Sequence, residues 1–234
     1  MSSTESPRTK VKALLFAQDD KYHPGIEDAL AAERATPWLE EMGIAVTRTK
    51  DRARWTREGL AQYQLFMPWL MPQWDVAKNA HEHIAPEEAE VVASFVRNGG
   101  GLFAFHGATV VPKPAEYEAY VDVLGTRFKS HPKYQEFDVR ITRPDHPITR
   151  GLKDFRTSDE LYIHLPLAPD AEVLATAEWE GETHPMAYTR RAGRGAVYYL
   201  ALGHDQATWD HPAFKQLVVN GARWLFEQTR SRAA

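Results

Sequence analysis

The sequence has 234 residues, which is long enough for one large α/β domain with a substantial core. Its net charge is −4 with both signs interspersed, so it lacks the basic stripe of a nucleic-acid-binding protein. The chain contains no cysteine, which excludes disulfides, thiolate metal ligands and a cysteine nucleophile.

The first ten residues are polar, and we expect them to be frayed, followed by a single α/β domain over residues 11–234. They lack the apolar core of a signal peptide, and no apolar run is long enough to span a bilayer. We therefore expect a cytoplasmic protein with no membrane partner. Association into a homo-oligomer stays open.

Short apolar runs alternate with amphipathic helical segments, which is typical of a mostly parallel sheet flanked by helices. We expect strands at 11–17, 44–49, 65–67, 102–105, 137–141, 171–177, 186–189 and 196–202. We expect helices within 26–42 and at 56–60, 86–99, 117–124 and 212–225. Pro37 should break the first of these, with Thr36 as the N-cap of a fresh helix, because proline kinks a helix interior.

The stretch GGGLFAFHGAT, from Gly99 to Thr109, is the most informative in the chain. Its continuously apolar run predicts a buried strand that ends at His106-Gly107. Open α/β sheets bind ligands at the carboxyl ends of their strands, so we expect His106 to face an open cleft and to serve function. The alternative is that Gly107 makes a tight turn and His106 is a partly exposed loop residue.

Other polar side chains also lie at predicted strand ends or in loops beside them. Since parallel strands end at one edge of a sheet, we expect several of these side chains to converge there. The candidate catalytic residues are His106, Glu160 and His204. The candidate substrate-binding residues of this kind are His23, His131, Tyr162, His184 and Asp205.

Two chemistries fit such a set. Neutral imidazoles with a carboxylate can hold Zn²⁺ or a similar divalent ion, with His23, His106 and His204 as candidate ligands. Alternatively, a histidine and a glutamate can act as an acid–base pair without a metal. The sequence has no HExxH motif, so both alternatives stay open. We expect no nucleotide cofactor, because the GGG segment ends a helix and opens a strand, the reverse of a dinucleotide fingerprint.

The segment 68–85 is irregular and carries Trp69, Trp74, His81 and His83. The two tryptophans could form the floor of a sugar-binding cleft, since aromatic rings offer flat apolar area to a pyranose. The alternative is that they cover the core beneath a loop. We interpret the two histidines as surface residues.

Together these segments resemble the ThuA-like family, which is named for trehalose utilisation. The resemblance spans residues 11–226 and rests on the order and spacing of several segments. These are GGGLFAFHGAT, FKSHP, DHPIT, DELY at Asp159 to Tyr162, HPMAYT at His184 to Thr189, and ALGHD at Ala201 to Asp205.

The resemblance implies a flavodoxin-like fold similar to class I glutamine amidotransferases, in which a cysteine occupies the turn near His106. Because this chain has no cysteine, amidotransferase chemistry is excluded. The resemblance also implies a small-molecule carbohydrate partner, either a sugar or a keto-sugar. In an isomerase, lyase or hydrolase, the roles of acid, base and electrophile would fall to His106, Glu160 and His204, and which residue takes which role stays open. The alternative is a non-catalytic sugar- or protein-binding module on a degenerate amidotransferase scaffold, in which these three residues would not share one pocket.

Overall fold

The protein is described here from a computed structural model, which covers residues 11–20, 22–69, 73–75, 80–82, 84–111 and 114–229. Within the covered ranges, the side chains of residues 73–75, 80–82 and 114 are not described. The first ten residues, which the sequence predicts to be frayed, lie outside these ranges.

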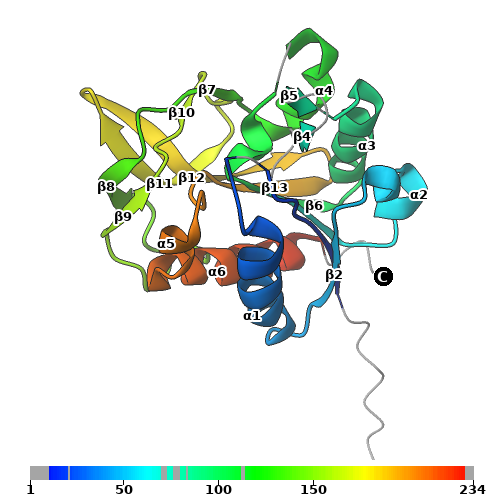
Figure 1. The fold of residues 1–234 in the computed structure, drawn as a ribbon, viewed down its shortest axis with the longest axis horizontal. Coiled ribbons are helices and arrows are strands. Elements are labelled where there is room, and N and C mark those ends of the chain that lie inside the picture. Colours follow the sequence, from blue (N-terminus) through cyan, green and yellow to red (C-terminus); the bar gives the residue numbers. More distant parts are fainter. Residues whose placement is uncertain are drawn as a thin grey trace, which may run out of the picture.

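A nine-stranded sheet forms the centre of the molecule (Figure 1). In spatial order its strands are β2 (Ala45–Thr49), β1 (Lys12–Phe16), β3 (Leu65–Pro68), β6 (Gly101–Phe105), β13 (Gly195–Leu200), β12 (Glu182–Ala192), β11 (Glu172–Trp179), β8 (Gln135–Ile141) and β9 (Phe155–Asp159). Two small antiparallel sheets pair β7 (Phe128–Ser130) with β10 (Ile163–His164) and β4 (Gln73–Asp75) with β5 (Ala80–Glu82).

The large sheet is mixed, which corrects the prediction of a mostly parallel one. Strands β2, β1, β3, β6 and β13 are parallel, as the apolar runs predict. The remaining strands, β12, β11, β8 and β9, are antiparallel to their neighbours. A two-residue connection permits only antiparallel pairing. One such turn, with positive φ at Glu180 and Gly181, joins β11 to β12.

Helices cover both faces of the sheet (Figure 1). Helices α1 and α6 lie on one side of the parallel half and α3 and α4 on the other. The helices are the π-helix η1 (Ile26–Ala35), α1 (Thr36–Glu40), α2 (Arg57–Leu60), α3 (Pro86–Arg97), α4 (Glu118–Leu124), α5 (Gln206–Trp209) and α6 (Pro212–Thr229). Single 3₁₀ turns are η2 (Arg52–Arg54), η3 (His106–Thr109) and η4 (Pro114–Glu116).

Local sequence accounts for most helix ends. Pro86 begins α3 in its first turn, and the Thr56 hydroxyl caps α2 by accepting from the amide of Gly59. The expected break near Pro37 is the junction at which η1 passes into α1. The N-cap there is Ala35 and not the predicted Thr36, whose hydroxyl donates to the Ala31 carbonyl at 2.7 Å.

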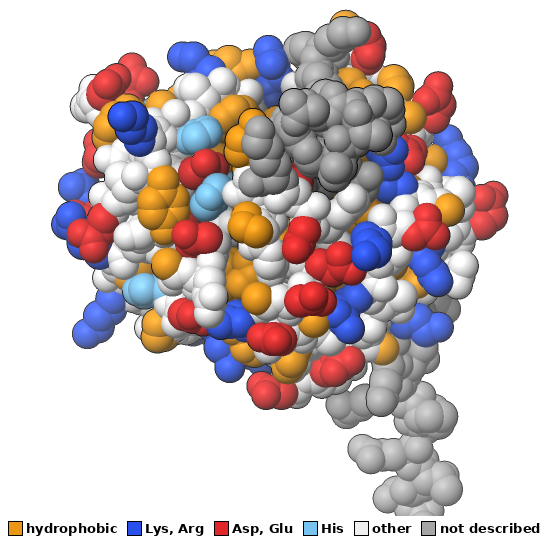
Figure 2. All heavy atoms as spheres, viewed as in Figure 1, with side chains coloured by type: hydrophobic (Ala, Val, Ile, Leu, Met, Phe, Trp, Pro, Cys, Tyr) orange, Lys and Arg blue, Asp and Glu red, His pale blue; other side chains and the backbone are white. Residues whose placement is uncertain are grey.

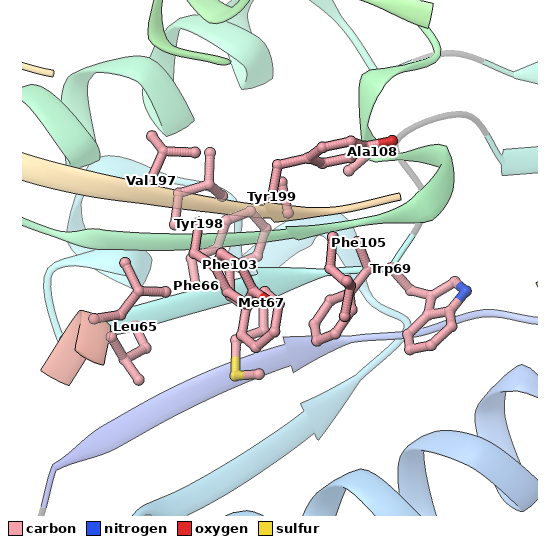
Figure 3. Close-up of a cluster of buried hydrophobic side chains, with 14 of the residues drawn as sticks. Leu65, Phe66, Met67, Trp69, Phe103, Phe105, Ala108, Val197, Tyr198 and Tyr199 are labelled. Carbon is pink, nitrogen blue, oxygen red and sulfur yellow. The ribbon is translucent and has the colours of Figure 1, made fainter. Parts of the chain in front are cut away.

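Aromatic side chains fill the core beneath the carboxyl ends of β3 and β6 (Figure 3). Trp69 is fully buried there, stacked on Phe105 at 4.9 Å and 4.3 Å from the ring of Trp209. Trp69 therefore covers the core, the alternative given above, and its fully buried ring leaves no surface for a sugar. The side chains of Trp74, His81 and His83 lie outside the described residues.

Candidate functional site

His106 occupies the turn at the carboxyl end of β6. Its φ of 34° is left-handed, which is uncommon for a residue with a side chain, whereas Gly107 is not left-handed. The Nδ1 atom lies 2.8 Å from the carbonyl oxygen of Ala201. A carbonyl only accepts, so Nδ1 carries a proton and Nε2 is the unprotonated atom of the neutral ring.

The imidazole of His106 is fully buried, which contradicts the expectation that it faces an open cleft. The hydrogen bond to Ala201 and the packing of the left-handed turn hold it below the surface. Its Nε2 atom lies 3.2 Å from the hydroxyl of Tyr162 and 3.4 Å from Oε2 of Glu160.

His23 lies in the loop that follows β1, as the sequence predicts. Its Nδ1 atom lies 2.9 Å from Oδ1 of Asp20, which also accepts from the amides of Tyr22 and His23. Burial lowers the pKa of His23, so its imidazole is neutral near pH 7. Its Nε2 atom is buried and has no hydrogen-bond partner among the described residues.

Glu160 is the acidic centre of the site. Its Oε2 atom lies 3.4 Å from Nε2 of His106 and 3.3 Å from Nδ1 of His204. Burial alone would raise the pKa of Glu160, but hydrogen bonds and charge from the two histidines outweigh it and hold that pKa well below its usual range. Burial would likewise lower the pKa of His204, but Glu160 raises it.

Asp159 forms hydrogen bonds with the backbone at His204. Its carboxylate accepts from the amide of Gly203 at 2.7 Å, the amide of His204 at 3.3 Å and the hydroxyl of Thr208 at 2.7 Å. The residue is fully buried, and burial raises its pKa. Asp159 therefore fixes the position of His204, while the next residue, Glu160, enters the centre.

Four side chains thus converge, as the sequence predicts. One ligand atom from each of His23, His106, Glu160 and His204 lies within 4.8 Å of the others. The three imidazole centres are 5.4 Å (His23–His106), 4.8 Å (His23–His204) and 5.5 Å (His106–His204) apart. Oδ2 of Asp20 and Nε2 of His23 are buried with no hydrogen-bond partner among the described residues, and Nδ1 of His204 is buried beside Oε2 of Glu160 at 3.3 Å. A cluster of nitrogen and oxygen atoms that can offer lone pairs is suited to bind a cation.

Three further predicted residues border this group. The ring of Tyr162 packs 4.3 Å from that of His106, and Nε2 of His131 lies 3.6 Å from Oε1 of Glu160. Asp205 accepts from the amides of Ala207 and Thr208 and so caps α5. On the face shown in Figure 2, histidine side chains are exposed beside acidic ones.

His184 lies outside the group. It is a buried residue of β12 and lines a separate cavity of about 460 Å³ beside β10. The prediction placed His184 near the strand ends that carry the site. Antiparallel pairing places the beginning of β12 beside the carboxyl end of β13, but His184 lines the cavity beside β10 and is not one of the clustered residues.

The comparisons with known proteins add a family to this geometry. The family model described as ThuA, trehalose utilisation, matches residues 12–225. The chain belongs to the ThuA family. No curated protein matches the sequence significantly.

Solved structures agree with this assignment of the fold. A protein from Bacteroides uniformis described as ThuA-like has 21% identity and a TM-score of 0.76, covering 99% of this chain and 97% of its own. A second, from Parabacteroides merdae, has 18% identity and a TM-score of 0.71, covering 93% and 90%. A β-galactosidase from Bacillus circulans has 15% identity and a TM-score of 0.61, and the match covers 94% of this chain but 31% of that enzyme. At these identities, the structures are similar in fold alone.

Two carboxylates of this ThuA-family site were not predicted as site residues. Asp20 orients His23, and Asp159 holds the His204 turn. Asp20 lies in the segment QDD after the first strand, and Asp159 lies in DELY. Neither segment predicts which backbone amide or which ring its carboxylate contacts. No helix among the described residues is long and apolar enough to cross a bilayer.

Proposed function

We propose that this ThuA-family protein is a metal-dependent enzyme that acts on a carbohydrate. His23, His106 and His204 hold a Zn²⁺-like ion, and Glu160 beside it acts as the acid–base group. The observation that carries the proposal is that ligand atoms of three histidines and Glu160 lie within 4.8 Å of one another, with the buried Nε2 of His23 without a hydrogen-bond partner among the described residues.

The ring spacing fits a single ion. Three imidazoles bound to one tetrahedral ion at about 2.0–2.1 Å place their ring centres about 5 Å apart. The centres here are 4.8–5.5 Å apart. Metal-binding histidines usually donate their other N–H to a carboxylate or a carbonyl, which fixes the tautomer. His23 has Asp20 in that role, and His106 has the carbonyl of Ala201.

Nδ1 of His106 contacts the carbonyl of Ala201, so Nε2 is the atom that faces Glu160 at 3.4 Å and would bind the ion. A cation held among the imidazoles would be attracted to the carboxylate beside it. Glu160 is ionised at neutral pH, which is the state in which a carboxylate can accept a proton.

An ion held here would polarise a carbonyl oxygen of a keto-sugar or lower the pKa of a bound water. In either case Glu160 takes the proton, from the carbon next to the carbonyl or from water. The ring of Tyr162 packs 4.3 Å from that of His106 and orients it. Three protein ligands, with Glu160 as base, leave a position open for substrate, as catalytic zinc sites require.

Aromatic rings near the site support a sugar substrate. Two large apolar side chains are exposed among the described residues, Tyr22 at 52% and Tyr134 at 42%. Tyr22 precedes His23, and the ring of Tyr134 lies 5.7 Å from that of His204. Flat aromatic surface beside carboxylate and imidazole groups is suited to the apolar face and hydroxyls of a pyranose.

Metal analysis of variants tests the proposal. Wild-type protein should bind about one Zn²⁺ per chain, and His23→Ala and His204→Ala should each lose it. Glu160→Gln should retain the metal but turn over its substrate about 10²–10⁴-fold more slowly, because it removes the acid–base group. His131→Ala is the matched control and should retain the metal. Full activity of metal-free wild-type protein would exclude the metal mechanism and favour the acid–base pair acting without a metal.

The substrate class is tested with the same preparations. Trehalose and its oxidised keto form are each incubated with wild type and with Glu160→Gln, and the products are identified by mass spectrometry. Turnover of the keto form alone would support proton abstraction next to a carbonyl, and turnover of trehalose would support hydrolysis. Binding of either sugar without turnover would support the non-catalytic alternative.

A further inference from the structure

A second cavity lies apart from the histidine cluster. It has a volume of about 460 Å³ and lies between β10 and the β11–β12 hairpin. None of the four clustered residues lines it, so the proposed metal site does not account for it. Its volume is within the range of small-molecule sites.

His184 contributes a largely buried polar group to the wall of this cavity. The residue is 7% exposed, and its side chain forms no hydrogen bond with any described residue. Neither of its ring nitrogens is fully sealed from solvent, so the ring is open to the cavity that it lines. Buried imidazoles normally have a hydrogen-bond partner, and this one is free to contact a polar group of a ligand.

Two opposite charges also line the cavity, Lys129 of β7 and Glu182 at the beginning of β12. Both residues are exposed, and neither forms an ion pair with the other or with any further residue that the structure describes. The ammonium is therefore available to an anionic group of a ligand and the carboxylate to a cationic group. A ligand that carries both charges fits this pair, whereas a singly charged ligand would meet one like charge.

The apolar part of the wall is aliphatic. Among the described residues, no phenylalanine, tyrosine or tryptophan lines the cavity. A pyranose packs on the flat apolar area of aromatic rings, so this wall does not favour a sugar. It favours a branched aliphatic group, because its apolar residues are Ile163, Leu165, Pro166, Leu167, Val173 and Pro185.

We propose that this cavity binds a small zwitterion with an aliphatic side chain, that is, a free amino acid of the size of leucine. Lys129 pairs with the carboxylate of the ligand and Glu182 with its ammonium group. The aliphatic side chain packs against the apolar wall, and the imidazole of His184 lies beside the bound molecule. The site is separate from the metal cluster and does not depend on it.

Nuclear magnetic resonance of the His184 imidazole in the full-length protein tests the proposal. Millimolar L-leucine should move its resonances saturably, and the shift should persist in His204→Ala, which disables the proposed metal site. Leucinamide lacks the carboxylate and 4-methylpentanoate lacks the ammonium group, so each should bind at least about tenfold more weakly. No movement with leucine, or tighter binding of glucose or trehalose at His184, would overturn the proposal.

Charge variants locate the binding. Lys129→Gln and Glu182→Gln should each weaken the affinity for leucine about tenfold, because each removes one charged partner. Lys129→Gln should leave the affinity for leucinamide unchanged, since that analogue has no carboxylate. Lys153→Gln, at an exposed lysine that does not line the cavity, is the matched control and should bind leucine as the wild type does. Equal leucine affinity in all three variants would show that leucine binds outside the cavity.

Discussion

The backbone of His106 is the most unusual feature at the scale of single residues. Its φ of 34° costs a residue with a Cβ atom roughly 1–2 kcal/mol relative to glycine. Strained residues of this kind cluster at functional sites, where the surrounding structure holds them in place. Here the hydrogen bonds from the ring to Ala201 and from Tyr199 to the His106 carbonyl supply that support.

Two substitutions of His106 distinguish the contribution of its ring to stability from the cost of its backbone strain. His106→Ala and His106→Gly both remove the imidazole and leave the Ala201 carbonyl without its donor, which should destabilise both proteins by roughly 1–3 kcal/mol. We expect the glycine variant to be about 1 kcal/mol more stable than the alanine variant, because glycine adopts the left-handed region freely. Urea unfolding of the two metal-free variants measures the difference. An alanine variant as stable as the glycine variant would show that the turn is not strained.

His164 makes stability depend on pH. Its pKa is about 3 in the folded protein, because burial disfavours the charged ring, and 6.5 when exposed. Between these values the unfolded chain binds a proton that the folded chain does not, so the free energy of unfolding falls as the pH falls below 6.5. From pH 7 to pH 5 the wild type should lose about 1–2 kcal/mol more than His164→Gln.

Urea titrations of metal-free wild type and His164→Gln at both pH values test this expectation. The variant serves as its own reference for every other group that titrates in the interval. Parallel losses in the two proteins would show that His164 accepts a proton in the folded state.

At the scale of elements, the close packing of α6 on β13 depends on one glycine. A Cβ atom added at Gly221 would lie 2.1 Å from the ring of Tyr198, far inside any real contact. Gly221→Ala should therefore destabilise the protein by about 1–3 kcal/mol, although alanine is the better helix former. Arg223→Ala, on the exposed side of the same helix, should change stability by less than about 0.5 kcal/mol. Thermal unfolding compares the two, and equal effects would show that α6 shifts freely.

The sequence predicts the strands better than their directions. The apolar runs at 102–105 and 196–202 correspond to β6 and β13, and both lie in the parallel half. The runs at 171–177 and 186–189 are also strands, but burial alone does not encode direction. The two-residue turn at Glu180 and Gly181 does encode it, since such a turn requires an antiparallel hairpin.

At the scale of the whole molecule, chain order predicts the convergence of the site but not its supports. His23, His106 and His204 follow parallel strands, so topology alone brings them to one edge. Asp20 and Asp159 could not be predicted as supports, because their roles depend on contacts with a particular ring or amide. Trp69 could not be separated from a binding-site tryptophan, because its burial depends on Trp209, 140 residues later.

The most direct test of the account is anomalous X-ray diffraction at the zinc edge from crystals of the wild-type protein grown with Zn²⁺. The account predicts one strong peak surrounded by the ring nitrogens of His23, His106 and His204, with Glu160 beside it. In crystals of Glu160→Gln the peak should remain, and in His204→Ala it should disappear. A wild-type crystal without a peak among these three imidazoles would contradict the proposed metal site.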